Sequence, residues 1–337
     1  MAADLSSSEF WAARRVLVTG AAGFIGSHLT ETLVREGASV TAFVRYNSRN
    51  DLGWLEVADP SLISEVEIFR GDLANPEAAR GATRDNDVVL HLGALIPIPY
   101  SYRHPREFVT ANIEGTLNVL EGCRQGEVSR LVHTSTSEVY GTALRVPIDE
   151  DHPLQAQSPY AASKVGADKL VLSYQQSFGT PVVVARPFNT FGPRQTARAI
   201  IPTIITQALT RDIVEVGATT PTRDFLYVED TVRGIMRCAE QPGVEGEVFN
   251  LGTGDEISVG DTAQRILALL ERELPIVEST TRLRPPNSEV ERLVADRSKA
   301  GKRLGWHPRV DFEEGLQRTI EWMRGSLDKY KAAIYNV

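Results

Sequence analysis

Three glycines that follow a short apolar run near the start of the chain restrict its possible folds more than any other feature. Arg15–Thr19 (RVLVT) has the β-branched, apolar composition of a buried strand, and Gly20, Gly23 and Gly26 follow it at three-residue spacing. Gly20 permits a tight turn, Gly23 lets backbone N–H groups approach a pyrophosphate, and Gly26 lets the next helix pack close to the strand. Three glycines can also form an ordinary turn, but the flanking strand and helix are those that dinucleotide binding requires.

The first half of the chain alternates apolar runs with segments of helical periodicity. The runs predicted as buried strands are 15–19, 39–44, 66–70, 87–92, 130–135 and 181–186, and the segments predicted as helices are 26–36, 112–126 and 159–178. Continuous apolar strands that alternate with helices are typical of a parallel sheet covered on both faces. The sequence therefore predicts an α/β fold with a Rossmann-type, doubly wound parallel sheet.

The composition changes after about Pro187, where glycine, proline and arginine become frequent. A further strand-like run, Val248–Leu251, suggests that the chain returns to the first domain before it ends in the second. We expect a smaller, interleaved C-terminal substrate domain. The predicted division is an N-terminal tail (1–13), a dinucleotide-binding domain (14–187 plus about 225–270) and a substrate domain (188–224 plus about 271–330).

The charge balance argues against nucleic acid as a partner. The 337-residue chain has 36 Lys and Arg against 44 Asp and Glu, a net charge of −8, whereas a few local arginines can still hold a small diphosphate. Only Cys123 and Cys238 are present, which supports neither a disulfide framework nor a metal site and fits a cytoplasmic location. No apolar run is long enough to suggest a signal peptide or a membrane span.

The residues that follow the second, third and fourth strands bear on the choice of cofactor. An acid after the second strand would bind the adenosine ribose of NAD, but Arg45 stands there, so NADP is allowed beside NAD. Arg45 can equally be an ordinary surface charge. Asp72 and Leu73 follow the third strand, and Leu92 and Ala94 follow the fourth, where they are candidates to contact the adenine and the ribose.

A tyrosine and a lysine share one face of the helix predicted at 159–178. Ser158 is a suitable N-cap, and Tyr160 and Lys164 lie four residues apart, one above the other. A phenol is a poor base at neutral pH, and a neighbouring ammonium favours the phenolate. The pair can remove the proton of a sugar hydroxyl while a nicotinamide takes the hydride. The residues expected to bind the cofactor are Gly20, Gly23, Phe24, Ile25, Gly26, Arg45, Asp72, Leu73, Leu92, Ala94, Tyr160 and Lys164.

A polar run, TSTSEVY, stands at the carboxyl end of the predicted strand 130–135, where ligands bind in open parallel sheets. Thr136 can hydrogen-bond the hydroxyl that is oxidised, and Glu138 is a candidate acid or base in the same pocket. The run can otherwise be a polar strand end with an incidental glutamate. We take Thr136, Ser137 and Glu138 as catalytic candidates beside Tyr160 and Lys164.

Together these motifs resemble the extended short-chain dehydrogenase/reductases, and most of all the nucleotide-sugar 4,6-dehydratases. The resemblance covers about residues 15–308 and rests on VTGAAGFIGSHL, HTSTSEVYG, SPYAASKVGAD, RPFNTFGPRQ, TRDFLYVED, NLGTGDEISV and RPPNSEVERLVADRSKAGKRLGWHP. It implies a tightly bound NAD or NADP that is recycled in each turnover. It also implies a homodimer joined through a four-helix interface.

The resemblance implies a role for each catalytic residue. Tyr160 removes the O4 proton as C4 gives hydride to the cofactor, a residue matching Glu138 takes the C5 proton, water leaves from C6, and the hydride returns to C6. Many relatives that act on dTDP-glucose carry an aspartate where this chain has Ser137, which cannot be a strong acid. We therefore expect Glu138 to serve at both C5 and C6.

On the substrate side, the resemblance matches Asn189 with an asparagine that binds the diphosphate or sugar, and Arg223 with an arginine of the nucleotide subsite. Arg284 and Glu289 lie in the segment that lines the same subsite, and Arg198 belongs to the arginine-rich part of this lobe. Each arginine can instead form a surface ion pair, which contributes only ~0 to 1 kcal/mol.

Three functions are compatible with these residues. The first is a 4,6-dehydratase that makes a 4-keto-6-deoxy nucleotide sugar. The second is a nucleotide-uronic acid decarboxylase or a nucleotide-sugar 4-epimerase on the same scaffold. The third is a protein that binds the cofactor without catalysis, which would have no need of Tyr160, Lys164 and Glu138 together.

Overall fold

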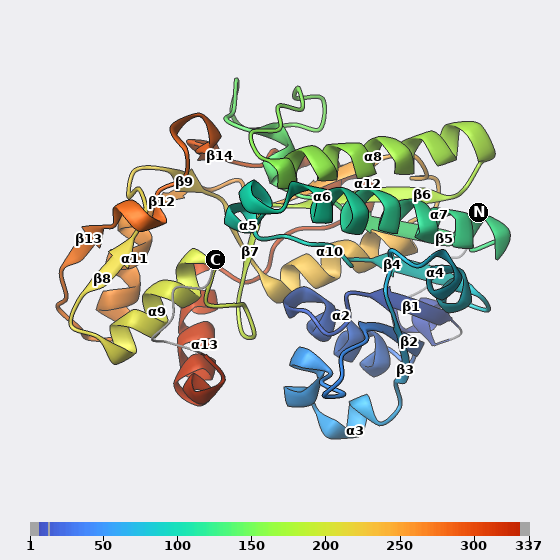
Figure 1. Cartoon of the computed structure of the whole chain (residues 1–337), viewed down its shortest axis with the longest axis horizontal. Helices are drawn as coiled ribbons and strands as arrows, with labels where there is room; N and C mark the ends of the chain where they lie inside the picture. Colours follow the sequence, from blue (N-terminus) through green and yellow to red (C-terminus); the bar gives the residue numbers. More distant parts are fainter. Residues whose placement is uncertain (1–6, 13, 331–337) are drawn as a thin grey trace.

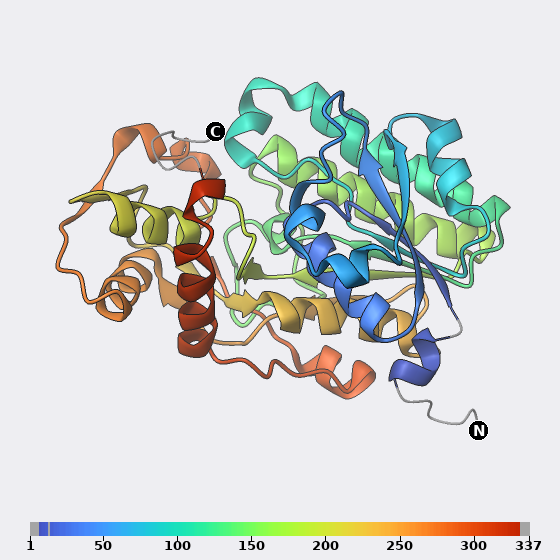
Figure 2. The same cartoon turned by 90° about the horizontal axis from the view of Figure 1, so that it is seen from below.

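The computed structural model describes residues 7–12 and 14–330 of the chain. Within these residues the central sheet has seven strands in the order β11-β6-β5-β4-β1-β2-β3, and every neighbouring pair is parallel (Figures 1 and 2). The strands are β1 (Arg15–Thr19), β2 (Ser39–Arg45), β3 (Glu67–Gly71), β4 (Val88–His91), β5 (Arg130–Thr134), β6 (Val182–Pro187) and β11 (Val248–Leu251). The predicted parallel, doubly wound sheet is confirmed.

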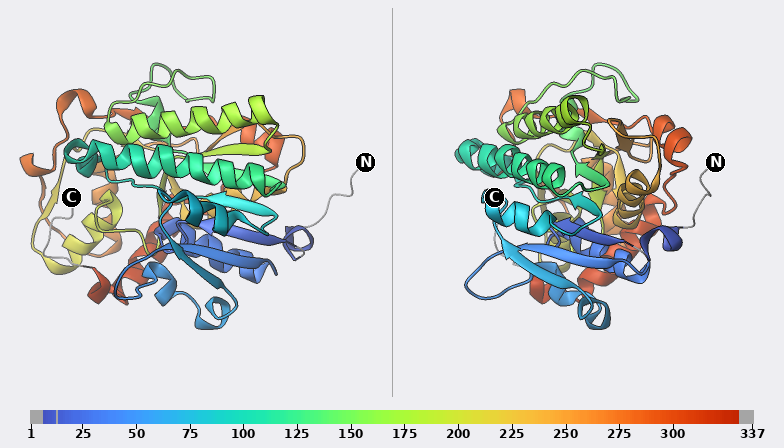
Figure 3. Two further views of the ribbon diagram at one scale, coloured as in Figure 1. Left: turned by 45° about the vertical axis from the view of Figure 1, so that its right-hand side comes forward. Right: turned by 90° about the vertical axis from the view of Figure 1, so that its right-hand side faces the viewer.

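Helices cover both faces of this sheet, because successive residues of its strands point to opposite sides. Val16 and Val18 of β1 pack toward one face, against Leu29 of α2 and Ile235 of α10, whereas Leu17 packs toward the other. The first face is covered by α2 (Phe24–Arg35) and α10 (Val228–Glu240), and the second by α4 (Pro76–Thr83), α7 (Gly115–Gln125) and α8 (Pro159–Phe178). Figure 3 shows α7 and α8 running side by side on the outside of the molecule.

The predicted elements agree with the observed ones to within one or two residues, except at the start of α7. There the helix runs without a break from α6 (Pro105–Phe108) through a π-helix, η2 (Val109–Glu114), into α7, whereas the prediction begins at residue 112. The pattern of apolar residues predicted α7 and only the last three residues of η2, because a π-turn shifts the residues that follow it around the helix axis.

A smaller lobe is built around short sheets beside the carboxyl edge of the main sheet. In it β7 (Asn189–Phe191) pairs with β10 (Phe225–Tyr227), β9 (Thr222–Arg223) lies between β12 (Ile257–Ser258) and β14 (Arg292–Leu293), and β8 (Val214–Val216) pairs with β13 (Ile276–Glu278). Its helices are α9 (Ile200–Thr210), α11 (Val259–Leu269) and α13 (Phe312–Arg324), whereas α12 (Ser298–Leu304) packs against β11 at the edge of the main sheet. The chain returns to the main sheet at β11, which pairs with β6.

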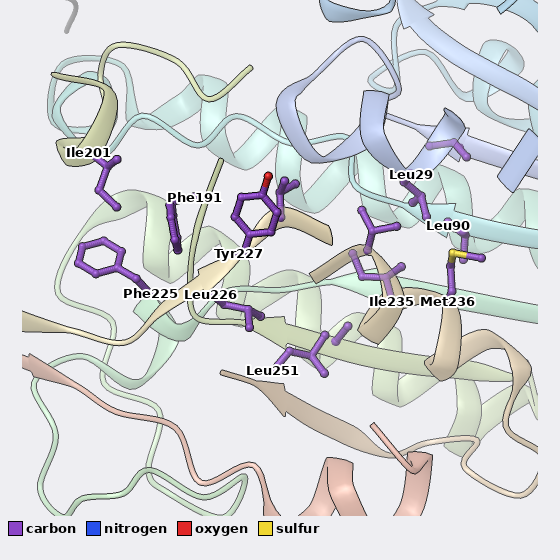
Figure 4. Packing of buried hydrophobic residues seen from close by; sticks show 14 of the residues in the cluster. Leu29, Leu90, Phe191, Ile201, Phe225, Leu226, Tyr227, Ile235, Met236 and Leu251 are labelled. Carbon is purple, nitrogen blue, oxygen red and sulfur yellow. The ribbon is translucent and has the colours of Figure 1, made fainter. Parts of the chain in front are cut away.

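One hydrophobic core continues from the main sheet into the smaller lobe. Figure 4 shows Leu90 of the sheet and Ile235 of α10 in the same cluster as Phe191, Phe225 and Ile201 of the smaller lobe. Since no break in apolar packing separates the two parts, the orientation of the smaller lobe over the sheet edge is set by burial of these side chains.

Short elements complete the described chain. They are α1 (Ser7–Trp11), η1 (Gly53–Val57), α3 (Pro60–Ile63), α5 (Ile98–Arg103), α6 (Pro105–Phe108), η3 (Ser137–Tyr140), η4 (Thr280–Arg282), η5 (Pro286–Ser288) and η6 (Leu327–Lys329). In the N-terminal segment that was expected to be a tail, Trp11 is fully buried and donates a hydrogen bond to Glu240 of α10. No described helix combines the length and the apolar character needed to cross a membrane.

Candidate active site

Two neighbouring cavities lie at the carboxyl edge of the main sheet, and Gly20 and Ala94 line both. The first has a volume of about 770 Å³ and is lined by Gly20, Ala22, Phe43, Arg45, Gly71, Asp72, Leu73, Ala74, Gly93, Ala94, Leu95, Arg103, His104, Pro105, Arg106, Glu107, Thr110 and Ala111. The second has a volume of about 520 Å³ and contains most of the catalytic candidates. The shared residues make the two cavities one continuous binding region.

The glycine turn has the geometry that a pyrophosphate needs. Gly20 adopts a φ of +73°, and a Cβ on Gly26 would lie 2.1 Å from the carbonyl oxygen of Gly20, so both positions require glycine. Gly23 is the N-cap of α2 and has no side chain to satisfy the first helical N–H groups, which stay available to an anion. Phe24 and Ile25 line the second cavity. These residues fit a bound dinucleotide.

The first cavity collects the other residues expected at the cofactor. Arg45 and Asp72 face each other across the ends of β2 and β3, with 3.4 Å between Nε and Oδ2, and both side chains are largely exposed. Leu73 and Ala94 line the same cavity, whereas Leu92 lines the second. The ion pair leaves the Arg45 guanidinium at the exposed rim of this cavity.

Tyr160 and Lys164 stand on the first turns of α8 and line the second cavity, as expected. The Ser158 hydroxyl accepts from the Ala161 N–H at 3.1 Å and so caps the helix. Lys164 Nζ donates to the carbonyl oxygen of Thr134 at 2.8 Å. This bond fixes the ammonium at the carboxyl end of β5.

The pKa values of this pair differ from the expectation that Lys164 favours the Tyr160 phenolate. Burial raises the pKa of Tyr160, a hydrogen bond with Thr136 lowers it, and the charges of Glu138 and Asp168 raise it further. Burial also lowers the pKa of Lys164 to about 8, against the charge of Asp168, which raises it. The residues around Tyr160 therefore favour its protonated form.

Glu138 projects from η3 into the second cavity beside Thr136, but Ser137 does not. Ser137 is buried and lines neither cavity. The Glu138 side chain is 12% exposed and lies near Arg284, with 3.6 Å between Oε1 and Nη1. The only carboxylate that lines this cavity among the described residues is therefore held next to a guanidinium.

The residues expected on the substrate side divide into two sets. Asn189 and Arg198 line the second cavity, as Arg284 does, and Asn189 Oδ1 is a buried atom with no hydrogen-bond partner among the described residues. Arg223 and Glu289 lie behind this wall, where Arg223 Nη2 donates to Glu289 Oε1 at 3.1 Å. An unsatisfied amide oxygen in the cavity is suited to a ligand with hydroxyl groups.

A buried network behind the catalytic pair was not anticipated from the sequence. Asp168 is fully buried and accepts from Ser135 Oγ at 2.8 Å and from Arg186 Nη2 at 2.9 Å, while His133 Nε2 lies 3.4 Å from its other oxygen. His133 Nε2 also lies 3.4 Å from Lys164 Nζ. Asp168 follows Lys164 by four residues, so the helical spacing that joined Tyr160 and Lys164 was a usable signal for it.

Asn112 was also missed, and it connects the π-helix to both sides of the site. Its Nδ2 donates to the carbonyl oxygen of Leu95 at 2.9 Å and to Ser163 Oγ at 2.9 Å, and its Oδ1 accepts from the Leu95 N–H at 2.7 Å. The side chain thus connects the loop after β4 to α8, the helix that bears Tyr160 and Lys164. No motif marks this asparagine, because its position follows from the π-turn.

The comparison with known proteins assigns the family. A sequence model described as GDP-mannose 4,6 dehydratase matches residues 17–319. The chain belongs to this family. A relative, the dTDP-glucose 4,6-dehydratase of an Actinoplanes species, is 33% identical over 318 residues, which are 93% of this chain and 98% of that protein.

Solved structures agree with this assignment to the GDP-mannose 4,6-dehydratase family. A dTDP-glucose 4,6-dehydratase from Streptomyces venezuelae, solved with NAD, is 28% identical with a TM-score of 0.83 and covers 94% of this chain and 99% of that one. An epimerase from Methanothermobacter thermautotrophicus is 29% identical with a TM-score of 0.85 and covers 96% of each chain. The resemblance to extended short-chain dehydrogenase/reductases is thereby confirmed.

As a member of the GDP-mannose 4,6-dehydratase family, the protein is an enzyme of the dehydratase class with a Rossmann-type site for NAD. Its structural relatives include both a dehydratase and an epimerase. The fold alone therefore does not decide the reaction, which has to be argued from the residues of the site.

Proposed function

We propose that the enzyme removes water from a nucleotide-diphosphate sugar and produces a 4-keto-6-deoxy sugar. The observation that supports this reaction is the carboxylate of Glu138 in the same cavity as Tyr160 and Lys164. Oxidation and reduction at C4 alone need only the tyrosine and the lysine. A carboxylate base is needed when the proton on the carbon beside the new ketone must also be removed.

The first half of the reaction takes place at O4. A bound nicotinamide would accept a hydride from C4 and later return it to C6. Tyr160 takes the O4 proton, and Thr136, which already shares a hydrogen bond with Tyr160, orients the hydroxyl. Lys164, fixed on the carbonyl oxygen of Thr134, contributes positive charge near the phenolate.

The second half of the reaction belongs to Glu138. Its carboxylate takes the C5 proton, the electron pair forms the C5–C6 double bond, and the C6–O bond breaks. Because Ser137 lies outside the cavity, Glu138 also returns that proton to the departing hydroxyl, which leaves as water. When hydride returns to C6, the proton kept on Tyr160 neutralises the resulting enolate, so the sugar loses one water and nothing else.

The charges of the cavity are compatible with a neutral sugar and with a uronic acid. Arg223 and Arg284 are paired with Glu138 and Glu289, and Arg198 and Lys164 line the same cavity as further cations. A dehydratase and a decarboxylase are therefore distinguished by their products.

The product distinguishes these reactions directly. Purified enzyme is incubated with UDP-, GDP-, CDP- and dTDP-linked sugars, and mass spectrometry is expected to show loss of one water from one of them. Glu138→Gln is expected to abolish this product while the cofactor stays bound. Release of carbon dioxide from a uronic acid, or a 4-epimer formed without loss of water, would instead establish one of the alternatives.

We further propose that the site accepts NADP as well as NAD and retains the cofactor through turnover. Arg103 and Arg106 line the first cavity together with Arg45, so several cations surround the place where a ribose phosphate would lie. In this arrangement residues 14–187 with about 225–270 bind the cofactor, and residues 188–224 with about 271–330 bind the substrate.

A homodimer through α7 and α8 is also proposed. The two helices lie side by side on the surface, and Val109 and Leu117 of this helical layer are 43% and 37% exposed (Figure 3). Apolar side chains on an outer helical layer favour pairing with the same layer of a second copy. Analytical ultracentrifugation is expected to give twice the mass of one chain.

A further inference from the structure

The loop that joins β7 to α9, residues 192–199, forms part of the wall of the second cavity. Gln195, Thr196, Arg198 and Ala199 of this loop all line that cavity. The loop contains no helix or strand of its own. Contacts with other elements therefore have to fix the place of these side chains.

Arg194 anchors the loop to α2, the helix that begins at the glycine turn. Its Nη1 donates to Glu31 Oε2 at 2.6 Å and to Ser27 Oγ at 3.3 Å, and the Arg194 and Glu31 side chains are only 9% and 5% exposed. One residue earlier in the loop, the carbonyl oxygen of Pro193 accepts from His28 Nε2 at 3.0 Å. Three residues of one helix thus hold two consecutive residues of the loop.

The backbone of Arg194 shows how firmly this anchor holds. Its φ of +69° lies in the left-handed region, which is unfavourable for a residue with a Cβ. Such a conformation persists only where the surroundings impose it. The buried ion pair with Glu31 and the contact with Ser27 provide such surroundings, so the loop leaves Arg194 in a direction that α2 determines.

Arg198 is the arginine of this cavity that has no counter-ion. Arg284 lies within 4 Å of two carboxylates, whereas Arg198 Nε donates to Thr196 Oγ1 at 3.3 Å and no carboxylate of the described residues pairs with it. A guanidinium matches two oxygens of a diphosphate. The first N–H groups of α2 are available to the pyrophosphate of the cofactor, which leaves Arg198 for the diphosphate of the substrate.

We propose that Arg194, through its ion pair with Glu31, positions Arg198 to bind the diphosphate of the substrate. This inference rests on the proposed function in that it takes a nucleotide-diphosphate sugar as the substrate. Arg194 lines neither cavity, so it is a positioning residue, and Arg198 is the ligand of the diphosphate. One helix, α2, then sets the place of both diphosphates, that of the cofactor at its N-terminus and that of the substrate through the loop.

Binding of nucleoside diphosphates tests this positioning without any turnover. The purified enzyme with its retained cofactor is titrated with UDP, GDP, CDP and dTDP by calorimetry. Arg194→Met keeps the length of the side chain and removes its charge, and it is expected to raise the Kd of the tightest of these ligands about tenfold. The control Arg145→Met removes an exposed arginine paired with Asp149 and is expected to leave this Kd unchanged. An unchanged Kd in Arg194→Met, or no binding of any of the four ligands to wild type, would overturn the proposal.

A double-mutant cycle shows whether Arg194 acts through Arg198. Arg198→Gln alone is expected to raise the Kd about tenfold. Adding Arg194→Met to it is expected to raise the Kd less than about twofold further, because the side chain that Arg194 positions is already gone. Two effects that multiply to about a hundredfold would refute the positioning of Arg198 by Arg194.

Two further measurements separate the ion pair from the backbone and from general damage to the fold. Arg194→Gly accepts the left-handed backbone but lacks the guanidinium, so it is expected to bind as weakly as Arg194→Met; wild-type affinity would assign the role to the backbone and overturn the proposal. In turnover, Arg194→Met is expected to raise KM about tenfold and to leave kcat within about twofold, because Tyr160 and Lys164 stand on α8 and not on this loop. A fall of kcat as large as the rise of KM would contradict a role in diphosphate binding alone.

The cofactor content of the purified variants excludes the other diphosphate. Cofactor released per chain on denaturation is expected to be the same in wild type and Arg194→Met, and a loss of cofactor with unchanged affinity for the nucleoside diphosphates would overturn the assignment to the substrate. Failure of the proposed function would look different. If the binding results are as expected but no nucleotide sugar loses water, the positioning stands and the reaction is wrong. If water is lost with wild-type KM in Arg194→Met, the reaction stands and the positioning is wrong.

Discussion

Replacing Asp168 by asparagine separates the stability of the site from its chemistry. Asp168 is fully buried, and it is the only carboxylate in direct contact with Arg186 within the part of the chain that the structure describes. Burial raises the pKa of Asp168, but the hydrogen bond with His133 and the charge of Arg186 outweigh it and lower the pKa to about 2. Asparagine keeps the shape and removes the charge, so Arg186 is left buried without a counter-ion.

The cost can be estimated in two ways. Removing one partner of a buried ion pair costs about 3–5 kcal/mol. The lowering of the Asp168 pKa from its ordinary 3.8 to about 2 corresponds to about 2 kcal/mol at about 1.4 kcal/mol per pH unit, which is of the same order. With an unfolding entropy of about 2.1 cal/mol/K per residue over 337 residues, a loss of about 3–5 kcal/mol lowers Tm by about 4–7 °C.

Thermal unfolding followed by circular dichroism or calorimetry measures this change. Asp212→Asn is the matched control, because Asp212 is fully exposed and forms a surface ion pair with Arg272 at 3.7 Å, which contributes little to stability. The Tm of this variant is expected to stay within about 1 °C of the wild-type Tm. The double variant Asp168→Leu with Arg186→Met is expected to recover part of the loss, since it removes the unpaired charge. A Tm for Asp168→Asn within about 1 °C of wild type would show that Arg186 is not an uncompensated buried charge.

The sign of the pH dependence follows from the lowered pKa. A carboxyl group with a lower pKa in the folded protein stabilises it above the unfolded value, and this contribution is lost as the pH falls. For Asp168 the loss occurs between about pH 4 and about pH 2, so the stability difference between wild type and Asp168→Asn is expected to narrow across this interval. A difference that stays constant down to pH 2 would contradict the role of its charge.

Three further predictions concern function. Lys164 has a pKa of about 8, so activity is expected to fall about tenfold per pH unit above pH 8. Asp168→Asn is expected to move this basic limb of the pH profile to lower pH, because the charge of Asp168 raises the pKa of Lys164. A flat profile above pH 8 would exclude the need for a charged lysine. Gly26→Ala is expected to weaken cofactor binding about tenfold or more in fluorescence titration, because its Cβ would lie 2.1 Å from the Gly20 oxygen. Gly325→Ala is the control, because the nearest atom to its Cβ would be 3.7 Å away. Equal cofactor affinity in the two variants would exclude close packing at the turn. Arg45→Ala is expected to raise the Kd for NADP about tenfold and to leave the Kd for NAD unchanged, measured by titration of cofactor-free enzyme. An unchanged preference would assign Arg45 to the surface ion pair with Asp72.

The predictions from the sequence were most accurate where chemistry is carried by residues close together in the chain. The glycine turn and the Tyr160–Lys164 pair depend on spacing within one turn and one helix, and the structure has both in the predicted elements. The polar run after β5 was also located correctly, but its internal orientation was not. Neighbouring residues of η3 point in different directions, so Glu138 enters the cavity and Ser137 does not.

The network behind the catalytic pair shows why other parts of the site were not found. His133 lies on β5, Asp168 on α8 and Arg186 on β6, and their contacts exist only after the helix packs on the sheet. Asn112 of the π-helix η2 reaches Leu95 after β4 and Ser163 of α8, contacts between three segments that are distant in the chain. Helical or strand periodicity contains no information about such contacts, because it describes one element at a time.

By itself the sequence determined the doubly wound sheet, the glycine turn before α2 and which residues are candidates for acid–base chemistry, because apolar periodicity, glycine conformation and side-chain chemistry are local properties. Only the tertiary structure decided which charges meet. Arg284 and Glu138 are 146 residues apart in the chain, yet their side chains lie 3.6 Å apart once the smaller lobe packs over the edge of the sheet. The physical reason is that electrostatic interactions depend on distance and burial in three dimensions, and both are set by the packing of the common core.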